Sequence, residues 1–136
     1  MPRQGSTNLL RLFRALADPT RLRLLNLMAD QEVCVCYLVE ILGLPQPKIS
    51  RHLAYLRAAG LVDARRDGKW MHYKIAALTD SGAEQILRLT LDQFHEDRAM
   101  QADVARLNRA CCAPTRYGLG GAPLPQTIPA ACCEVR

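Results

Sequence analysis

The feature that most limits the fold of this chain is an abrupt change of sequence period at Gly60. Before it, Ile49, Leu53 and Leu56 repeat at helical spacing, which predicts a helix over about 47–59. After it come two short runs typical of strands, joined by a strong two-residue hairpin signal. The strands are expected over about 61–66 and 69–75, around Asp67-Gly68.

Further helical patterns precede and follow this helix and hairpin. Asp18 can cap the second of them, and Pro19 suits its first position. We expect helices over about 8–17, 19–29, 32–42 and 80–109. The last, at about 30 residues, is longer than one small domain needs, so we expect part of it to pack on a second copy of the chain. This order of elements predicts a mainly α winged helix-turn-helix, with the small β-hairpin as the wing.

The chain of 136 residues is long enough for one domain with a modest core. Residues 1–109 are expected to form that domain. The segment 110–136 holds four of the eight prolines and three of the eight glycines, so we expect a flexible, cysteine-containing C-terminal tail. No apolar run is long enough to cross a bilayer, and the N-terminus lacks a signal-peptide core. We therefore expect a cytoplasmic protein with no membrane partner.

The formal net charge of +5 is confined to one part of the chain. Between Gln46 and Lys74 there are seven Lys and Arg residues against two Asp, whereas the rest of the chain is neutral. A positive excess in one short segment predicts a polyanionic partner there, although a solvated basic surface would give the same pattern.

The polar side of the helix expected over 47–59 carries side chains that donate and accept hydrogen bonds. Such a helix fits the major groove of double-stranded DNA, and basic residues at a hairpin tip can bind phosphates. The residues expected to contact DNA are Gln46, Lys48, Ser50, Arg51, His52 and Tyr55 on the helix, and Arg65, Arg66 and Lys69 at the tip.

Several stretches of the sequence resemble the ArsR/SmtB family of metal-responsive transcriptional repressors, the arsenical resistance repressor type. The stretches are LADPTR at 16–21, EVCVC at 32–36, QPKISRHLAYLR at 46–57, AGLV at 59–62 and GKWMHY at 68–73. The resemblance covers about 9–75 and implies a repressor that forms a homodimer through its first and last helices. Such a dimer would bind a two-fold operator with half-sites roughly one helical turn apart.

The six cysteines form three close pairs, which are Cys34 with Cys36, Cys111 with Cys112, and Cys132 with Cys133. Because no signal peptide indicates an oxidising compartment, clustered thiols favour a soft metal ion or thiol chemistry over disulfides. The resemblance implies trivalent arsenic as the inducer, either arsenite or an organic arsenical such as methylarsenite, with antimonite as a further candidate. No organic cofactor is expected.

Cys34 and Cys36 are expected to open the helix predicted over 32–42. Residues two apart on an α-helix point about 200° from each other, so one ion would join both only if the first turn unwound. That distortion would displace the DNA-reading helix and release the operator. Because coupling is reciprocal, bound DNA would weaken ligand binding by the same factor.

The sequence leaves the third donor open. The family's arsenic sensors often have a third cysteine where this chain has Val39, and an acidic residue where it has Tyr37. A methylated arsenical would need only two thiolates. For arsenite, the Cys111-Cys112 pair is preferred because it follows the last helix directly, whereas the Cys132-Cys133 pair requires a longer segment to be ordered. The two later pairs could instead form a separate arsenical site.

Other signals fit the same fold. A cadmium, lead or zinc sensor would gather more thiolates, and a thiol redox switch would oxidise neighbouring cysteines. Asp92, His95 and Glu96 have part of the spacing of a zinc site, but no second histidine follows, so we expect a solvated helix face. His72 is expected to be structural or to contact phosphate. The chain has no Cys-X-X-Cys, phosphate loop or dinucleotide glycine motif, so we do not expect an enzyme.

Overall fold

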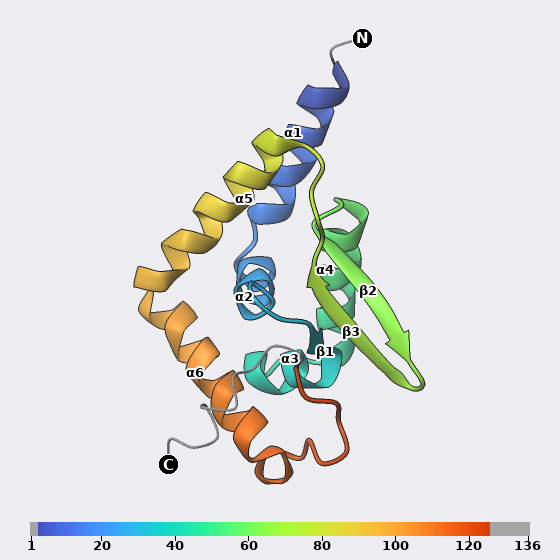
Figure 1. Cartoon of the computed structure of the whole chain (residues 1–136), viewed down its shortest axis with the longest axis vertical. Coiled ribbons are helices and arrows are strands. Elements are labelled where there is room, and N and C mark those ends of the chain that lie inside the picture. The colour runs from blue at the N-terminus through green and yellow to red at the C-terminus, as the bar shows by residue number, and fades with distance from the viewer. Residues whose placement is uncertain (1–2, 126–136) are drawn as a thin grey trace.

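The structure is a computed structural model that describes residues 3–125. In chain order, its elements are α1 (Arg3–Leu16), α2 (Pro19–Leu27), β1 (Val33–Cys34), α3 (Val35–Leu42), α4 (Gln46–Ala58), β2 (Val62–Asp67), β3 (Trp70–Ile75), α5 (Ser81–Gln93), η1 (Phe94–Glu96), α6 (Arg98–Cys112) and η2 (Pro114–Tyr117). Figure 1 shows α2 and α3 at the centre, α4 and the hairpin β2–β3 on one side, and α5 with α6 on the other. The predicted mainly α, winged helix-turn-helix fold is confirmed.

The core lies where α2, α3, α4 and α6 meet. Leu25, Leu38, Leu53 and Leu107 enter it from these four helices and are fully buried. Each such leucine contributes roughly 1.5–3 kcal/mol by leaving water. Gly43 ends α3 in the left-handed conformation, with φ of 66°, which lets the chain turn into α4. The position of α4 is therefore fixed by its packing on the central helices.

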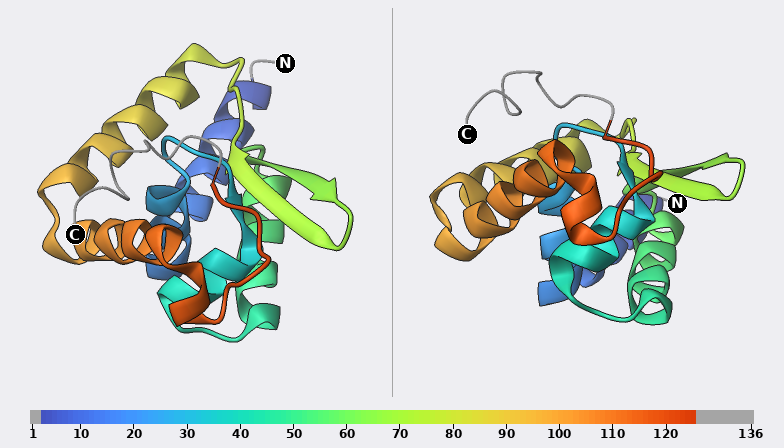
Figure 2. Two further views of the ribbon diagram at one scale, coloured as in Figure 1. Left: turned by 60° about the horizontal axis from the view of Figure 1, so that its bottom comes forward. Right: turned by 90° about the horizontal axis from the view of Figure 1, so that it is seen from below.

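A short strand that the sequence did not predict joins the hairpin. β1 pairs with β3 antiparallel, so the sheet order is β1-β3-β2. At the tip, Asp67 pairs with Trp70 and Gly68 has φ of 60°, so the two-residue turn is Gly68-Lys69, one position later than expected. In Figure 2 the hairpin projects away from the helices.

The single helix expected over 80–109 is wrong, because the chain interrupts it between Gln93 and Arg98. Asp97 has an extended conformation, and its side chain accepts a hydrogen bond from the Met100 N–H, which caps a new helix. Phe94 is buried at the break. The break lets α6 pack on α2 and α3, and the expectation that part of this region packs on a second copy of the chain stays a prediction.

Helices α1 and α5 leave apolar side chains in solvent. In α1, Leu12 is buried, but Leu9, Leu10 and Phe13 are 38%, 50% and 53% exposed. In α5, Leu89 is 63% exposed. Gathered apolar surface of this kind is a mark of an interaction site. Neither helix, nor any other within the described part, is long and apolar enough to cross a membrane.

The expected boundary between residues 109 and 110 falls inside α6. Ala110 and Cys111 are buried, and beyond η2 the chain returns to the core, where Leu119 is 6% exposed. Whether 110–136 acts as a flexible tail stays a prediction, because residues 126–136 lie outside the described part.

Candidate nucleic-acid interface and thiol site

Helix α4 presents the polar face that the sequence predicted. Its apolar stripe, Ile49, Leu53 and Leu56, is fully buried and holds the helix against the core. Of the residues expected to contact DNA, Gln46, Lys48, Arg51 and Tyr55 are exposed, and Ser50 and His52 are half-buried. The face is therefore open to a duplex, as major-groove reading requires.

The wing carries basic side chains towards its tip. Arg65, Arg66 and Lys69 are all exposed, and Lys69 Nζ lies 5.0 Å from the centroid of the Trp70 ring. The Arg65 guanidinium donates to the Glu32 carboxylate at 2.7 Å, and this hydrogen bond lowers the pKa of Glu32. Because Arg65 is already paired, Arg66 and Lys69 are better placed to meet phosphates.

Sequence reasoning missed Arg21 of α2, which lies against α4, the helix expected to contact DNA. Its Nη1 is 3.4 Å from His52 Nδ1, and its guanidinium carbon is 4.2 Å from the centroid of the Tyr55 ring. Asp18, the N-cap of α2, accepts a hydrogen bond from the Arg21 backbone N–H at 3.0 Å. Burial raises the pKa of Asp18, but that hydrogen bond and the nearby His52 and Arg21 outweigh it and lower the pKa. The sequence signals for Arg21 were its place at the end of the LADPTR stretch and its position three residues after a helix cap.

Cys34 and Cys36 are brought together by a change of backbone conformation between them. Cys34 ends β1 with extended angles, φ −67° and ψ 142°, whereas Cys36 lies in the first turn of α3. Their Sγ atoms are 2.9 Å apart. The expectation that the two side chains point apart on one helix is wrong. The inference that the helix must unwind before one ion can bind both thiols is also wrong.

The two paired thiols differ in acidity. The Cys34 sulfur accepts a hydrogen bond from the Cys36 thiol, which lowers the pKa of Cys34 to about 7 despite its burial. Hydrogen bonds from the backbone N–H groups of Cys36, Val35 and Met71 lower it further. The pKa of Cys36 is raised, because its proton is held by the Cys34 sulfur. Cys34 is therefore the thiol of the pair that ionises first, and the thiolate is the form that binds soft ions.

Cys111 lies on a different helix from the Cys34–Cys36 pair. It is buried in α6, which packs on α3. The hydroxyl of Tyr37, a residue of α3, is buried and has no hydrogen-bond partner among the described residues. Burial, and then the thiols of Cys111, Cys36 and Cys34, raise the pKa of Tyr37 to about 12.

A three-donor site is not preformed in the described part of the chain. No three His, Cys, Asp or Glu side chains within residues 3–125 are placed to hold one metal ion. Cys112 is half-buried at the end of α6, and Cys132 and Cys133 lie outside the described residues. A third thiolate would therefore have to move towards Cys34 and Cys36.

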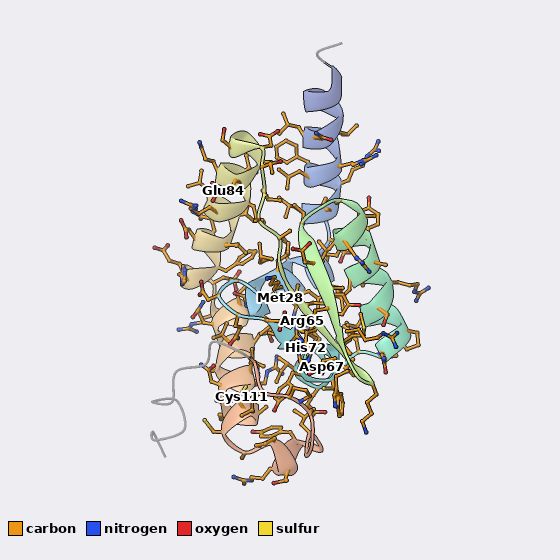
Figure 3. All side chains as sticks on the ribbon, turned by 45° about the vertical axis from the view of Figure 1, so that its right-hand side comes forward. Met28, Arg65, Asp67, His72, Glu84 and Cys111 are labelled. Atoms are coloured by element: carbon orange, nitrogen blue, oxygen red, sulfur yellow. The ribbon has the colours of Figure 1, made fainter. Side chains whose placement is uncertain are left out.

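The wing lies directly beside the thiol pair. Cys34 pairs with His72 across the sheet and His72 pairs with Arg65, so the three residues form one row. Glu32, two residues before Cys34, accepts the hydrogen bond from Arg65. His72 is 1% exposed and cannot reach a phosphate, and its Nε2 lies 3.8 Å from the Asp67 carboxylate. Figure 3 shows Arg65, His72 and Asp67 close together along the sheet.

Residues 18–64, which contain both the thiol pair and the DNA-reading helix, match the family model described as "Bacterial regulatory protein, arsR family". Over 107 residues the chain is 41% identical to the arsenical resistance operon repressor of Escherichia coli strain K12, a match that covers 76% of this chain and 88% of that protein. The chain belongs to the ArsR family. The family expected from the sequence is therefore confirmed.

Solved structures agree with this assignment to the ArsR family. HlyU from Vibrio cholerae superposes with a TM-score of 0.60 at 28% identity, over 68% of this chain and 97% of that chain. The AntR antimony-specific transcriptional repressor superposes with a TM-score of 0.53 at 32% identity, over 67% of this chain and 80% of that chain. The present chain is a DNA-binding transcriptional regulator, and not an enzyme.

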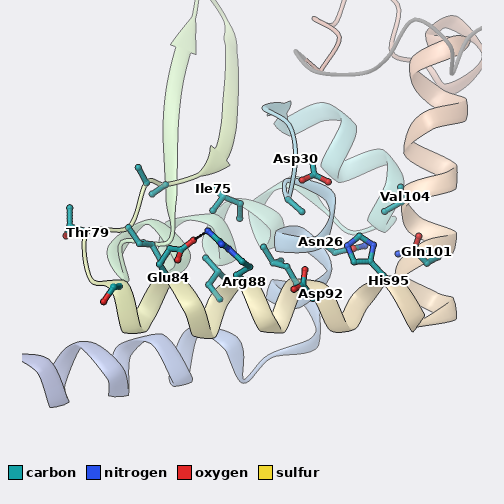
Figure 4. Close-up of a pocket in the computed structure, with 17 residues that line it drawn as sticks. Asn26, Asp30, Ile75, Thr79, Glu84, Arg88, Asp92, His95, Gln101 and Val104 are labelled. Carbon is teal, nitrogen blue, oxygen red and sulfur yellow. Dashed lines mark hydrogen bonds and ion pairs between the residues drawn. The ribbon is translucent and has the colours of Figure 1, made fainter.

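The residues with partial zinc-site spacing are divided between two elements of this ArsR-family chain. Asp92 lies in α5, His95 and Glu96 lie in η1, and all three are exposed. Asp92 and His95 line a pocket of about 700 Å³ along α5, where Figure 4 shows His95 near Asn26 and Gln101. Within residues 3–125 they belong to no group of three metal-binding side chains.

Proposed function

We propose that this chain is a transcriptional repressor that releases its operator when trivalent arsenic binds the thiolates of Cys34 and Cys36. The observation that carries the proposal is the 2.9 Å separation of their Sγ atoms at the junction of β1 and α3. Thiolates are the ligands that soft trivalent ions prefer, and the lowered pKa of Cys34, about 7, favours its thiolate form. The name of the Escherichia coli relative supports arsenic, and the similarity to the antimony-specific repressor AntR supports antimonite as a further ligand.

Arsenite and methylarsenite differ in the number of thiolates that they accept. Methylarsenite keeps one bond to carbon, so Cys34 and Cys36 satisfy it, whereas arsenite has room for a third thiolate. We take Cys111 as that donor, because it is buried in α6, a helix that packs on α3. Its half-buried neighbour Cys112 is the second choice. The Cys132-Cys133 pair is less favoured, since a longer segment must be ordered.

The signal would reach the DNA-reading surface through β1. Cys34 is paired with a wing residue, His72, and the Glu32 carboxylate binds Arg65 of the wing at 2.7 Å. Helix α3, which begins directly after Cys34, packs on α4. A ligand that draws the two sulfurs towards α6 would shift the junction of β1 and α3 relative to both the wing and α4. The change is a displacement of this junction, and α3 does not need to unwind.

The DNA-binding unit in this proposal is a homodimer. The exposed apolar side chains of α1 and of α5, among them Leu10, Phe13 and Leu89, are the surface that a second copy would cover. A dimer of this kind presents two copies of α4 to a two-fold operator, with half-sites roughly one helical turn apart.

The test measures operator release by fluorescence anisotropy with arsenite, methylarsenite, antimonite, cadmium and zinc in turn. We expect arsenicals to release the wild type and to leave Cys34→Ser and Cys36→Ser bound, with unchanged DNA affinity before the inducer is added. Val35→Ala is the matched control, because it lies between the two cysteines and leaves both thiols in place. Normal release of Cys34→Ser by arsenite would show that the sensing site is wrong. If cadmium or zinc released the operator and the arsenicals did not, the inducer would be that metal ion and not arsenic.

Oxidation of the same pair is a second candidate signal. It is favoured by the 2.9 Å between the sulfurs and by the pKa of about 7 of Cys34. A peroxide would take two electrons from the thiols, joining them as a disulfide with release of two waters. Operator release by hydrogen peroxide without arsenic, reversed by dithiothreitol, is the expected result of this mechanism. Continued operator binding in peroxide would rule it out.

A further inference from the structure

The Arg21 side chain is held at the end of α1. Its Nε donates to the Ala15 carbonyl at 2.8 Å, and its Nη2 donates to the Arg14 carbonyl at 2.9 Å. These carbonyls belong to the last turn of α1, where helix carbonyls lack partners within the helix and attract cations. Two hydrogen bonds to fixed backbone atoms set the plane of the guanidinium.

The same guanidinium meets two of the side chains expected to read DNA. Its Nη1 faces His52 Nδ1 at 3.4 Å, and its face lies 4.2 Å from the centroid of the Tyr55 ring. Tyr55 is 43% exposed, so the ring remains partly open to solvent while it contacts Arg21. One side chain thus joins the end of α1 to the polar face of α4.

The contact with Arg21 constrains the protonation of His52. A guanidinium can only donate hydrogen bonds, so the facing Nδ1 must accept and the proton of a neutral imidazole is left on Nε2. The Asp18 carboxylate lies 3.7 Å from the same Nδ1 and would favour the opposite tautomer. Its oxygen also accepts the Arg21 backbone N–H at 3.0 Å, and the guanidinium is the nearer of the two groups to Nδ1.

We propose that Arg21 is a positioning residue for DNA recognition, which holds His52 as an Nε2–H donor and fixes the Tyr55 ring. The proposal rests on the DNA-reading role proposed for α4. An Nε2–H group can pair only with acceptors, such as purine N7, guanine O6, thymine O4 or a phosphate oxygen. His52 would therefore discriminate acceptor atoms from the amino groups of adenine and cytosine.

Lysine cannot replace Arg21 in this role. The planar guanidinium donates to two carbonyls and to an imidazole in one plane while its face stacks on an aromatic ring. An ammonium group keeps the positive charge but is a point donor without a flat face. Arg21→Lys thus separates the effect of geometry from the effect of charge.

The test uses a duplex selected from random sequences with the wild-type protein, and a scrambled duplex of the same composition. We expect Arg21→Lys to weaken binding to the selected duplex about tenfold. Binding to the scrambled duplex should change less than about twofold, because it depends on phosphates. Arg98→Lys, exposed in α6, is the matched control and should bind both duplexes as the wild type does.

A second readout is the tautomer of His52, measured by long-range proton–nitrogen NMR and assigned with His52→Gln. We expect the Nε2–H form in the wild type and a shift towards Nδ1–H in Arg21→Lys, because Asp18 then becomes the nearest group. Unchanged selectivity in Arg21→Lys, or an Nδ1–H tautomer in the wild type, would overturn the proposal. If the wild type selects no sequence at all, the proposed function fails, and the tautomer still decides the role of Arg21.

Discussion

The Sγ atoms of Cys34 and Cys36 lie 2.9 Å apart because one residue ends a strand and the other begins a helix. This junction places a thiolate with a pKa of about 7 beside the wing and at the start of the helix that packs on α4. Thiol chemistry and the DNA-reading surface therefore share the same short segment of chain.

The ionisation of Cys34 is directly measurable. Thiolate absorbance in the ultraviolet should rise as the pH increases through about 7, and this step should be absent from Cys34→Ser. The Cys36 thiol supplies the hydrogen bond that lowers the pKa of Cys34 most. Cys36→Ala should therefore raise the pKa at which the absorbance changes, towards the ordinary thiol value of about 8.5. Cys112→Ser is the control and should keep the step near 7. A wild-type titration without it would contradict the hydrogen-bonded pair.

The ion pair of Glu32 and Arg65 should carry part of the coupling between inducer and DNA. In Glu32→Gln, we expect the ratio of operator affinities without and with arsenite to fall about fivefold. The intrinsic affinity for arsenite should be unchanged, because both thiols remain. Glu40→Gln, exposed on α3, is the control. Anisotropy titrations at fixed salt give the operator affinities without and with arsenite. An unaltered ratio of these affinities in Glu32→Gln would show that the ion pair with the wing does not transmit the inducer signal.

The third donor should distinguish the two arsenicals. Cys111→Ser should lower the affinity for arsenite about tenfold or more, because one of three thiolates is lost, and should leave methylarsenite affinity nearly unchanged. Cys112→Ser should alter neither. Isothermal titration with each arsenical provides the comparison. If Cys111→Ser lowered the affinity for both arsenicals equally, the cause would be a packing defect in the core. That result would exclude Cys111 as a ligand.

The exposed apolar face of α1 should hold the proposed dimer together. Phe13→Glu replaces a side chain that is 53% exposed with a charged helix former, so we expect it to raise the dimer dissociation constant about 100-fold. Leu124→Glu changes a similarly exposed apolar residue near the end of the described chain and is the control. Sedimentation equilibrium measures the effect. A dimer as stable as the wild type in Phe13→Glu would place the interface elsewhere.

Asp103 should stabilise the packing of α6 on α2. Its buried carboxylate accepts hydrogen bonds from Arg23 at 2.8 and 3.0 Å and also from Arg106. Asp103→Asn should lower the free energy of unfolding at neutral pH by roughly 2 kcal/mol, measured with urea at one protein concentration. The exposed Asp92→Asn should have little effect.

The acid dependence of this effect has a defined sign. Burial raises the pKa of Asp103, but the two arginines outweigh it and the folded-state pKa is lowered. The stabilisation is therefore complete above the unfolded pKa of about 4 and is lost as the pH falls through the lowered folded value. The difference in the free energy of unfolding between the wild type and Asp103→Asn should decrease as the pH falls over that range. A difference that does not change with pH would assign the loss to packing alone.

The sequence by itself determined the elements whose signals are local. The stripe of Ile49, Leu53 and Leu56, the glycine in the hairpin turn and the cap at Asp18 depend only on residues a few positions apart. The DNA-reading face of α4 follows from that stripe, because burying one side of a helix exposes the other.

Only the tertiary structure decided how the thiol pair and the recognition face are held. β1 is two residues long and is defined only by pairing with β3, so Cys34 was placed on a helix until that partner was known. Arg21 and His52 are 31 residues apart in the chain and meet because α2 packs on α4. Contacts of this kind come from the packing of whole elements, and no local pattern in the sequence encodes them.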